Sequence, residues 1–212
     1  MSMASGKRDF DKAAATWDEN PARVKLADDV CAAICCEVSL SAAMKVMDFG
    51  CGTGLLTLRM APQVGSVTGV DRSQGMLDVL GAKVAALGLG NVETLRVDPD
   101  DGAILTGRYD LIVSCMALHH VERIAPLLEQ FYDCLVPGGP LCIADLDPDE
   151  GQFHGDSAGV FHAGFERAVL RQALTDAGFR DVSDVTATEV TKPAANGELR
   201  RFTIFLITGR RE

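Results

Sequence analysis

The chain has 212 residues, of which 47% are hydrophobic and 24% are charged, so it is long enough to form one domain around a single large core. Its 20 Lys and Arg residues and 30 Asp and Glu residues give a formal charge of −10. An acidic chain gains little from counterion release on phosphates, which argues against a nucleic-acid partner. No apolar run approaches the roughly 18 residues that a membrane-spanning helix needs. These properties predict a cytoplasmic, soluble protein with no membrane partner.

The cysteines support the same compartment. There are seven, an odd number, and most lie within apolar stretches, which favours reduced thiols over disulfides. Cys31, Cys35 and Cys36 lie together, but no second pair completes the four ligands of a structural zinc site. The first residues of the chain also lack the apolar core of a secretory signal.

Two helices are predicted at the N-terminus. The apolar residues from Phe10 to Trp17 recur at the i, i+3, i+4, i+7 spacing of one helical face. Asn20-Pro21 supplies a cap and a first residue for a second helix. We expect residues 1–40 to form a helical cover and residues 41–212 to form the remainder of the same domain.

Strands and helices then alternate along the chain. The predicted strands are Met44–Phe49, Ser66–Asp71, Val92–Val97, Tyr109–Cys115 and Leu141–Leu146. The predicted helices between them are Leu55–Ala61, Gly75–Leu87 and Val121–Leu135. This alternation predicts an α/β fold with a doubly wound, mainly parallel sheet.

The C-terminal part has a different pattern. A predicted helix, Phe165–Ala177, is followed by two β-rich runs, Val182–Val190 and Arg201–Thr208. Two consecutive strands joined by a short loop favour an antiparallel hairpin at the edge of the sheet.

A glycine-rich turn links the first predicted strand to the next helix. Its residues are Val46-Met47-Asp48-Phe49-Gly50-Cys51-Gly52-Thr53-Gly54. Glycines permit a sharp turn and a close approach of the backbone to a ligand, and the helix that follows offers unpaired N–H groups. Asp48 suits a ligand with an ammonium group better than an anionic pyrophosphate. Asp71 ends the second strand, 21 residues after Gly50, where an acid can accept both hydroxyls of a ribose.

This DxGxGxG turn, with an acid at the end of the second strand, resembles the class I S-adenosylmethionine-dependent methyltransferases of the small single-domain, type 11/12-like kind. LVPGG at Leu135–Gly139 and YDLIVSCMALHHV at 109–121 resemble the same family. The resemblance implies a Rossmann-like seven-stranded sheet of order 3-2-1-4-5-7-6, with the last strand antiparallel. It also implies that residues 41–212 bind S-adenosylmethionine and release S-adenosylhomocysteine.

The resemblance also implies roles for individual residues. Asp48 and the glycine turn would hold the methionine part of the cofactor, Asp71 the ribose, and Met76 and Asp98 the adenine. Pro99 stands where the family often has alanine. The full implied set is Asp48, Phe49, Gly50, Cys51, Gly52, Thr53, Gly54, Asp71, Arg72, Met76, Asp98, Pro99, Ser114 and Met116.

Structural roles remain open for several of these residues. Asp48 could instead cap a turn, and Asp71 and Asp98 could be solvated ends of strands. Met76 could be an ordinary core residue, and Ser114 could serve only as a small side chain at the end of a strand.

Trp17, His119 and His120 are the candidate substrate residues. No catalytic residue is assigned, because a sulfonium methyl group is already activated and the protein mainly has to align it with the acceptor. His120 is the candidate base for an acceptor that arrives protonated. Alternatively, either histidine could cap or pack a helix, and Trp17 could belong to the core.

Acids and histidines near the fifth strand are further candidates. Asp145 and Asp147 end that strand, either as solvated acids or as a site that attracts a cationic substrate. The glycine-rich segment that follows could be a lid or an irregular connection. It carries His154 and His162, but a metal site would need further ligands that their spacing does not supply. No metal site is therefore predicted.

The sequence thus predicts methyl transfer to an unidentified small-molecule acceptor by a monomer or a homodimer. No Asn-Pro-Pro-Tyr-like segment follows the fourth strand, which argues against DNA adenine as the acceptor. Three alternatives remain open. They are an NAD(P)-dependent oxidoreductase, a catalytically inactive cofactor-binding module, and an enzyme that methylates a thiol-bound metalloid.

Overall fold

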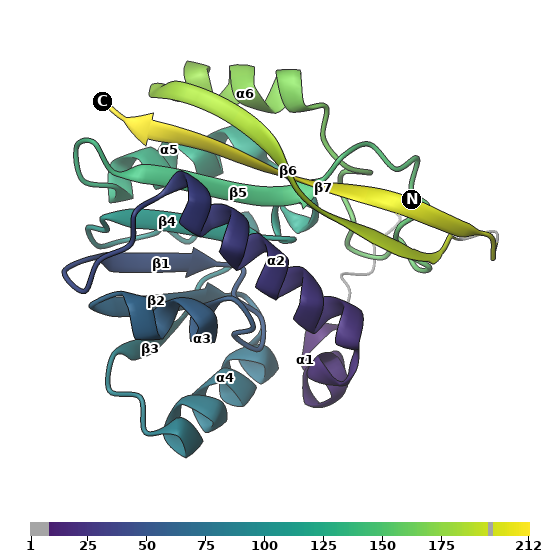
Figure 1. The fold of residues 1–212 in the computed structure, drawn as a ribbon, viewed down its shortest axis with the longest axis horizontal. Coiled ribbons are helices and arrows are strands. Elements are labelled where there is room, and N and C mark those ends of the chain that lie inside the picture. The colour runs from purple at the N-terminus through teal and green to yellow at the C-terminus, as the bar shows by residue number, and fades with distance from the viewer. Residues whose placement is uncertain (1–8, 195–196) are drawn as a thin grey trace.

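The computed structural model describes residues 9–194 and 197–212, and a seven-stranded sheet organises the molecule (Figure 1). The strands are β1 Lys45–Phe49, β2 Ser66–Asp71, β3 Val92–Arg96, β4 Leu111–Cys115, β5 Pro140–Leu146, β6 Phe179–Pro193 and β7 Leu199–Arg211. Their order is β3-β2-β1-β4-β5-β7-β6. Neighbouring strands from β1 to β5 pair in parallel, and β7 is antiparallel to both β5 and β6. The predicted fold class, strand order and antiparallel last strand are confirmed.

Helices cover both faces of this sheet. The α-helices are α1 Phe10–Ala13, α2 Pro21–Glu37, α3 Thr57–Met60, α4 Gln74–Leu87, α5 Ile124–Cys134 and α6 Arg167–Asp176. Short 3-10 helices are η1 Ala14–Glu19, η2 Ala61–Gln63, η3 Pro99–Asp101 and η4 Leu118–His120. Among the described residues, no helix combines the length and the apolar character needed to cross a membrane.

The core has one apolar layer on each face of the sheet. Met47 and Ile112 pack with Phe131 of α5 on one face. Val46 and Leu111, whose side chains alternate with those residues, pack with Ile34 of α2 on the other. The central strands are buried on both faces, as expected for a parallel sheet between helices. This arrangement makes the strand ends rigid supports for a site.

The N-terminal helices are built partly as predicted. The Asn20 side chain accepts a hydrogen bond from the Ala22 backbone N–H (2.9 Å), and Pro21 is the first residue of α2, so this predicted helix start is confirmed. The stretch before it was expected to form one helical face, but α1 ends at Ala13 and the chain continues as η1. Such a short helix is marginal by itself, so tertiary contacts decide its form.

The C-terminal hairpin is longer than the apolar pattern indicates. β6 and β7 pair from Phe179 with Arg211 to Pro193 with Leu199, and the hairpin extends past the other strands (Figure 1). Much of β6 is a polar, exposed edge, so apolar alternation does not mark its ends. The division at residue 40 stays a prediction, and residues 1–8 of that cover lie outside the described residues.

Candidate functional site

A cavity of about 320 Å³ opens where β1, β2 and β4 end, which is where parallel α/β sheets bind ligands. Its volume lies within the range of small-molecule sites, roughly 300 to 1,000 Å³. Most residues predicted for the site line this one cavity. They are Trp17, Asp48, Phe49, Gly50, Cys51, Gly52, Thr53, Asp71, Arg72, Met76, Asp98, Pro99, Met116, His119 and His120.

Two predicted residues do not line the cavity. Gly54, with φ +83°, fits against Leu80, because a Cβ there would lie 2.3 Å from a Leu80 methyl group. Ser114 is fully buried in β4, whereas its neighbour Cys115 lines the cavity. Adjacent residues of a strand face opposite sides, so the pleat brings Cys115, and not Ser114, into the site.

The glycine turn is held tightly against β2 and against the loop after β4. The backbone N–H groups of Gly50 and Cys51 both donate to the carbonyl oxygen of Val70 (2.7 and 3.0 Å). Gly50 has φ +71°, and a Cβ there would lie 2.2 Å from the Cβ of Ala117. Glycine is therefore required both by the backbone conformation and by the close approach of two loops.

Asp71 is fixed by backbone amides at the edge of the cavity. Its two carboxylate oxygens accept hydrogen bonds from the N–H groups of Gly52 and Ser73, each at 2.8 Å. Burial raises the pKa of Asp71 above its usual value, although these amide donors oppose the shift. Each oxygen retains a lone pair for a ligand hydroxyl group.

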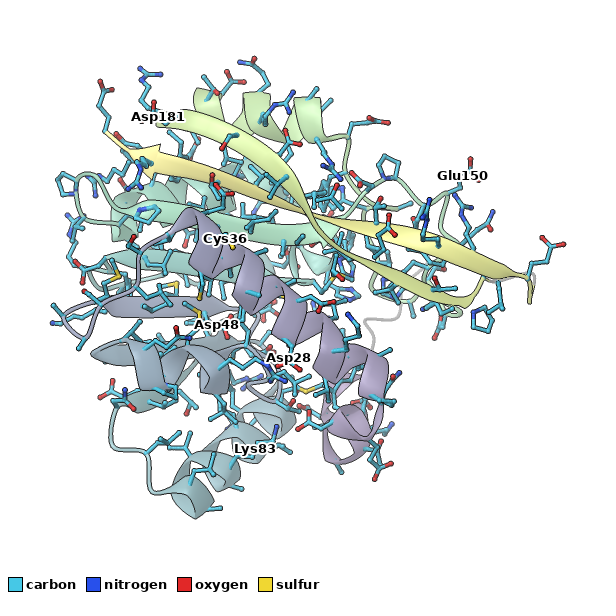
Figure 2. The ribbon with its side chains drawn as sticks, in the orientation of Figure 1. Asp28, Cys36, Asp48, Lys83, Glu150 and Asp181 are labelled. Carbon is cyan, nitrogen blue, oxygen red and sulfur yellow. The ribbon has the colours of Figure 1, made fainter. Side chains whose placement is uncertain are left out.

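Asp48 lies near the carboxyl end of β1, in the middle of the molecule (Figure 2). It is 1% exposed, and its carboxylate accepts a hydrogen bond from the Thr57 hydroxyl at 2.6 Å. Burial raises the pKa of Asp48 to about 7, the Thr57 hydrogen bond opposes this shift, and the charge of Asp71 adds to it. A cationic ligand in the cavity would reverse the shift, because it stabilises the carboxylate.

Met76 and Asp98 lie around the same part of the cavity. Met76 is 2% exposed, and its sulfur would be 3.9 Å from a Cβ placed on Gly52. Asp98 accepts a hydrogen bond from the Asp100 backbone N–H (3.1 Å) and so caps η3 while it lines the cavity. Both residues thus combine a structural position with access to a ligand.

His119 and Asp145 form a buried pair on another side of the cavity. Nδ1 of His119 lies 2.7 Å from Oδ1 of Asp145, and the two side chains are 1% and 0% exposed. Burial raises the pKa of Asp145, but the charge and hydrogen bond of His119 outweigh it, so the net shift is downward. The expectation of a solvated acid at Asp145 is wrong. Asp147 is paired with Arg167, at 2.6 Å, instead of facing the cavity.

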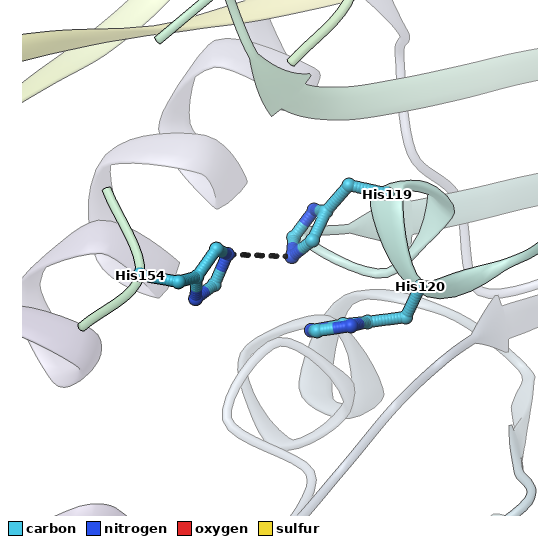
Figure 3. A group of neighbouring side chains, drawn as sticks. All are labelled: His119, His120 and His154. Carbon is cyan, nitrogen blue, oxygen red and sulfur yellow. Dashed lines mark hydrogen bonds between the residues drawn. The ribbon is translucent and has the colours of Figure 1, made fainter. Parts of the chain in front are cut away.

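His120 and His154 lie beside this pair (Figure 3). Nδ1 of His120 donates to the carbonyl oxygen of Gly159 at 2.7 Å, and Nε2 of His154 lies 3.2 Å from Nε2 of His119. Burial, with the nearby histidines, lowers the pKa of His120 to about 3. Ligand atoms of the three histidines lie within 4.8 Å of one another, so they could hold a metal ion.

This grouping differs from the pair considered from the sequence. His162 lies 3.0 Å from the Val121 carbonyl oxygen through Nε2 and is not among the cavity-lining residues, whereas His154 lines the cavity with His119 and His120. No local signal connects His154 to the other two, because the contact depends on how the segment after β5 folds back over η4.

The N-terminal cover closes the cavity and joins its two sides. The Phe10 ring lies 5.0 Å from the His120 ring and 5.9 Å from the Trp17 ring, between centroids. The Thr53 hydroxyl of the glycine turn donates to Asp18 (2.5 Å), and Lys83 of α4, labelled in Figure 2, also binds Asp18. The cover therefore depends on contacts with the glycine turn.

The segment after β5 also contributes to the cavity. Phe153 lines it and packs between the Phe202 ring (5.2 Å between centroids) and the Lys192 ammonium group (3.8 Å to the ring centroid). The Phe161 backbone N–H donates to the His119 carbonyl oxygen at 2.9 Å. Opening of this segment as a lid stays a prediction.

Sequence comparison places the chain among methyltransferases. Residues 46–139 match a family model described as a methyltransferase domain. A demethylmenaquinone methyltransferase of Symbiobacterium thermophilum is 38% identical over 108 residues, which are 49% of this chain and 43% of the relative. A ubiquinone biosynthesis O-methyltransferase of Marinobacter nauticus is 31% identical over 144 residues, 64% and 55% of the two chains. The chain spans about half the length of these relatives.

Solved structures share the fold over nearly the whole chain. A SAM-dependent methyltransferase from Aquifex aeolicus has a TM-score of 0.71 at 22% identity and covers 95% of this chain and 98% of its own. The putative methyltransferase in complex with the Haloferax volcanii Trm112 activator has a TM-score of 0.75 at 20% identity and covers 96% and 98%. By its glycine turn, strand order and matched domain, the chain belongs to the class I S-adenosylmethionine-dependent methyltransferase family.

Proposed function

We propose that the chain binds S-adenosylmethionine in this cavity and transfers its methyl group to a small-molecule acceptor, leaving S-adenosylhomocysteine. The observation that carries the proposal is the pair of acids on either side of the glycine turn. Asp48 is buried without an ion-pair partner among the described residues, and Asp71 is held by two amides with its oxygens at the cavity. One end of the cavity thus suits a cation and the neighbouring part suits a pair of hydroxyls.

The residues around these acids fit the rest of the cofactor. Gly52 leaves open space between Asp71 and the sulfur of Met76, where a side chain would otherwise intrude. Met76 and Asp98 then provide an apolar face and an acceptor for an adenine ring. In this proposal Asp48 acts on the ammonium group of the cofactor through the glycine turn, and Arg72 and Met116 complete the walls.

Bound there, the cofactor supplies a methyl group on a sulfonium that is activated toward in-line displacement. The task of the protein is to align the acceptor with that methyl group and to exclude water. Trp17 and Phe10 cover the cavity, and Phe153 and His154 close the side after β5. His119 and His120 face the acceptor rather than the cofactor, because they follow β4, beyond Met116.

A small acceptor is favoured by the shape and charge of the site. The cavity is roofed by the N-terminal cover and the segment after β5, and the chain carries a formal charge of −10. The printed names of the two relatives, which refer to ubiquinone biosynthesis and demethylmenaquinone, also support a small organic acceptor. All seven cysteines are free thiols, which supports a reducing compartment such as the cytoplasm.

Calorimetric titration tests the cofactor. S-adenosylmethionine and S-adenosylhomocysteine should each bind one site per chain, and NAD and NADP should bind at least a hundredfold more weakly. Tighter binding of either nicotinamide would overturn the proposal in favour of an oxidoreductase. Release of S-adenosylhomocysteine with panels of hydroxyl, thiol and amine acceptors tests transfer, and cofactor binding without turnover on any panel would support an inactive cofactor-binding module.

A further inference from the structure

Three histidines from two distant segments converge at the cavity wall. His119 and His120 belong to η4, and His154 comes from the segment after β5 (Figure 3). One ring nitrogen of each lies within 4.8 Å of the others, and the Nε2 atoms of His119 and His154 are 3.2 Å apart. Two nitrogens bound to one tetrahedral Zn²⁺ lie about 3.3 Å apart, because each Zn–N bond is about 2.0 to 2.1 Å.

The surrounding acceptors fix the tautomers of two of these rings. The Asp145 carboxylate lies 2.7 Å from Nδ1 of His119, and the Gly159 carbonyl oxygen lies 2.7 Å from Nδ1 of His120. Because an ionised carboxylate and a carbonyl oxygen can only accept, each Nδ1 carries the proton. The lone pair of each ring is therefore on Nε2, which is the atom that a metal needs.

These outer contacts are typical of metal-binding histidines. Such a histidine usually donates its second ring N–H to a carboxylate or to a backbone carbonyl oxygen, which orients the ring and makes its free nitrogen more basic. Asp145 does this for His119 and Gly159 does it for His120. Asp145 is fully buried, so the carboxylate is held in place by the core of the protein.

We propose that His119, His120 and His154 bind one late first-row transition-metal ion, with Zn²⁺ as the best match. Neutral imidazoles suit zinc, copper, nickel and iron, whereas magnesium and calcium prefer oxygen ligands. Three histidines complete a site of the open kind, in which a fourth position is left to water or to a bound ligand. A small movement of one ring closes the present separation of the nitrogens to that of a metal site.

The site extends the function proposed above, on which its meaning for catalysis rests. The three histidines line the same cavity as the glycine turn and Asp71. The fourth coordination position therefore lies on the acceptor side, where it is open to an oxygen, nitrogen or sulfur atom of a bound molecule. The binding of metal itself requires only the three histidines and can be measured without cofactor or acceptor.

Metal binding is tested on the full chain without a purification tag, after removal of metal with a chelator. Calorimetry with Zn²⁺ and elemental analysis should give one ion per chain, and Co²⁺ should give a visible spectrum typical of nitrogen ligands. His154→Ala and His120→Gln should each weaken Zn²⁺ binding at least tenfold. The matched control is His162→Ala, which removes the fourth histidine of the chain and should change affinity less than twofold.

Two further measurements keep the outcome decisive. Cys35 and Cys36 are exposed and could bind Zn²⁺ themselves, so the Cys35→Ser/Cys36→Ser variant should retain the site. Loss of binding in that variant, or full binding in a folded His154→Ala or His120→Gln variant, would overturn the proposal, as would absence of Zn²⁺ and Co²⁺ binding. S-adenosylhomocysteine is titrated into the same preparations. Metal binding without cofactor binding would refute the proposed function alone, and the reverse would refute the metal site alone.

Discussion

The two sides of the cavity are built in different ways. The glycine side, Gly50 to Met76, comes from one continuous stretch of chain, and backbone amides form much of its surface. The histidine side brings together Trp17, His119 and His154, which are far apart in the sequence, and consists mainly of side chains. A side made by backbone tolerates few substitutions, whereas a side made by side chains can change its chemistry without changing the fold.

The two sides also differ in how their buried acids are balanced. On the glycine side burial raises the pKa values of Asp48 and Asp71, so both carboxylates favour a ligand that brings positive charge or hydrogen-bond donors. On the histidine side His119 more than offsets the burial of Asp145 and lowers its pKa. The glycine side is therefore completed by a ligand, while the histidine side is already paired within the protein.

Gly50→Ala should produce the largest effect. Its Cβ would overlap Ala117, and φ +71° is unfavourable for alanine, so we expect a loss of about 3 kcal/mol in the free energy of unfolding. S-adenosylhomocysteine affinity should fall more than a hundredfold, because the turn must move. Urea unfolding and calorimetry measure the two effects.

Gly88→Ala is the matched control for this change. Gly88 has φ +65°, but a Cβ there would meet nothing within 4 Å, so only the backbone strain of about 1 to 2 kcal/mol applies. Adding Ala117→Gly to Gly50→Ala should recover the steric part of the loss. Equal effects of Gly50→Ala and Gly88→Ala on cofactor affinity would show that the close approach of the loops is unimportant.

Asp71→Asn should have the next largest effect. The amide replaces one acceptor oxygen with a donor that faces either Gly52 N–H or Ser73 N–H, so one hydrogen bond of the glycine side is lost. A hydrogen bond to a charged group contributes about 1.5 to 3 kcal/mol, which corresponds to roughly a 10- to 100-fold loss of cofactor affinity. Calorimetry measures it, with Asp78→Asn on the exposed side of α4 as the control. Unchanged affinity would remove Asp71 from the ribose site.

The contrast between the sides also decides what the sequence can predict. Apolar strands and the turn that follows β1 are local patterns, so the strand order and most of the glycine side follow from them. Ser114 was misplaced because the strand's apolar run does not indicate which residue faces the cavity, and the pleat puts Cys115 there. The grouping of His154 with His119 was missed because a contact across 35 residues depends on how the whole segment after β5 folds.

Acidification should weaken cofactor binding by a smaller amount. Asp48 has a pKa of about 7 in the empty protein, so at lower pH it is protonated and must lose its proton for a cation to be favoured. Affinity should therefore be level above pH 7 and fall below it, by up to about tenfold per pH unit. Calorimetry between pH 5.5 and 7.5 should show about a tenfold decrease. Asp48→Asn should bind more weakly and lose most of this dependence, and an unchanged profile would contradict the assignment.

Asp18→Asn tests the contact between the cover and the glycine turn. Asp18 accepts from the Thr53 hydroxyl and pairs with Lys83, and the two charged side chains are about one-third and one-quarter exposed. A pair of this kind is worth about 0.5 to 1 kcal/mol, so we expect about a threefold loss of cofactor affinity and faster dissociation. Trp17, the sole tryptophan, lines the cavity and reports both by its fluorescence. Asp28→Asn, on the exposed side of α2, should leave the dissociation rate unchanged.

Asp145→Asn should leave cofactor affinity unchanged within twofold while it destabilises the protein. Oδ1 of Asp145 accepts from the Leu146 N–H and lies beside Nδ1 of His119, and Oδ2 accepts from the His119 backbone N–H. An amide at this position puts donor against donor and leaves His119 buried without its carboxylate. Breaking a buried pair costs about 3 kcal/mol or more, which urea unfolding would detect. If cofactor affinity fell in proportion to stability, the two sides would be one cooperative unit, and the independence of backbone-built and side-chain-built parts of the cavity would be wrong.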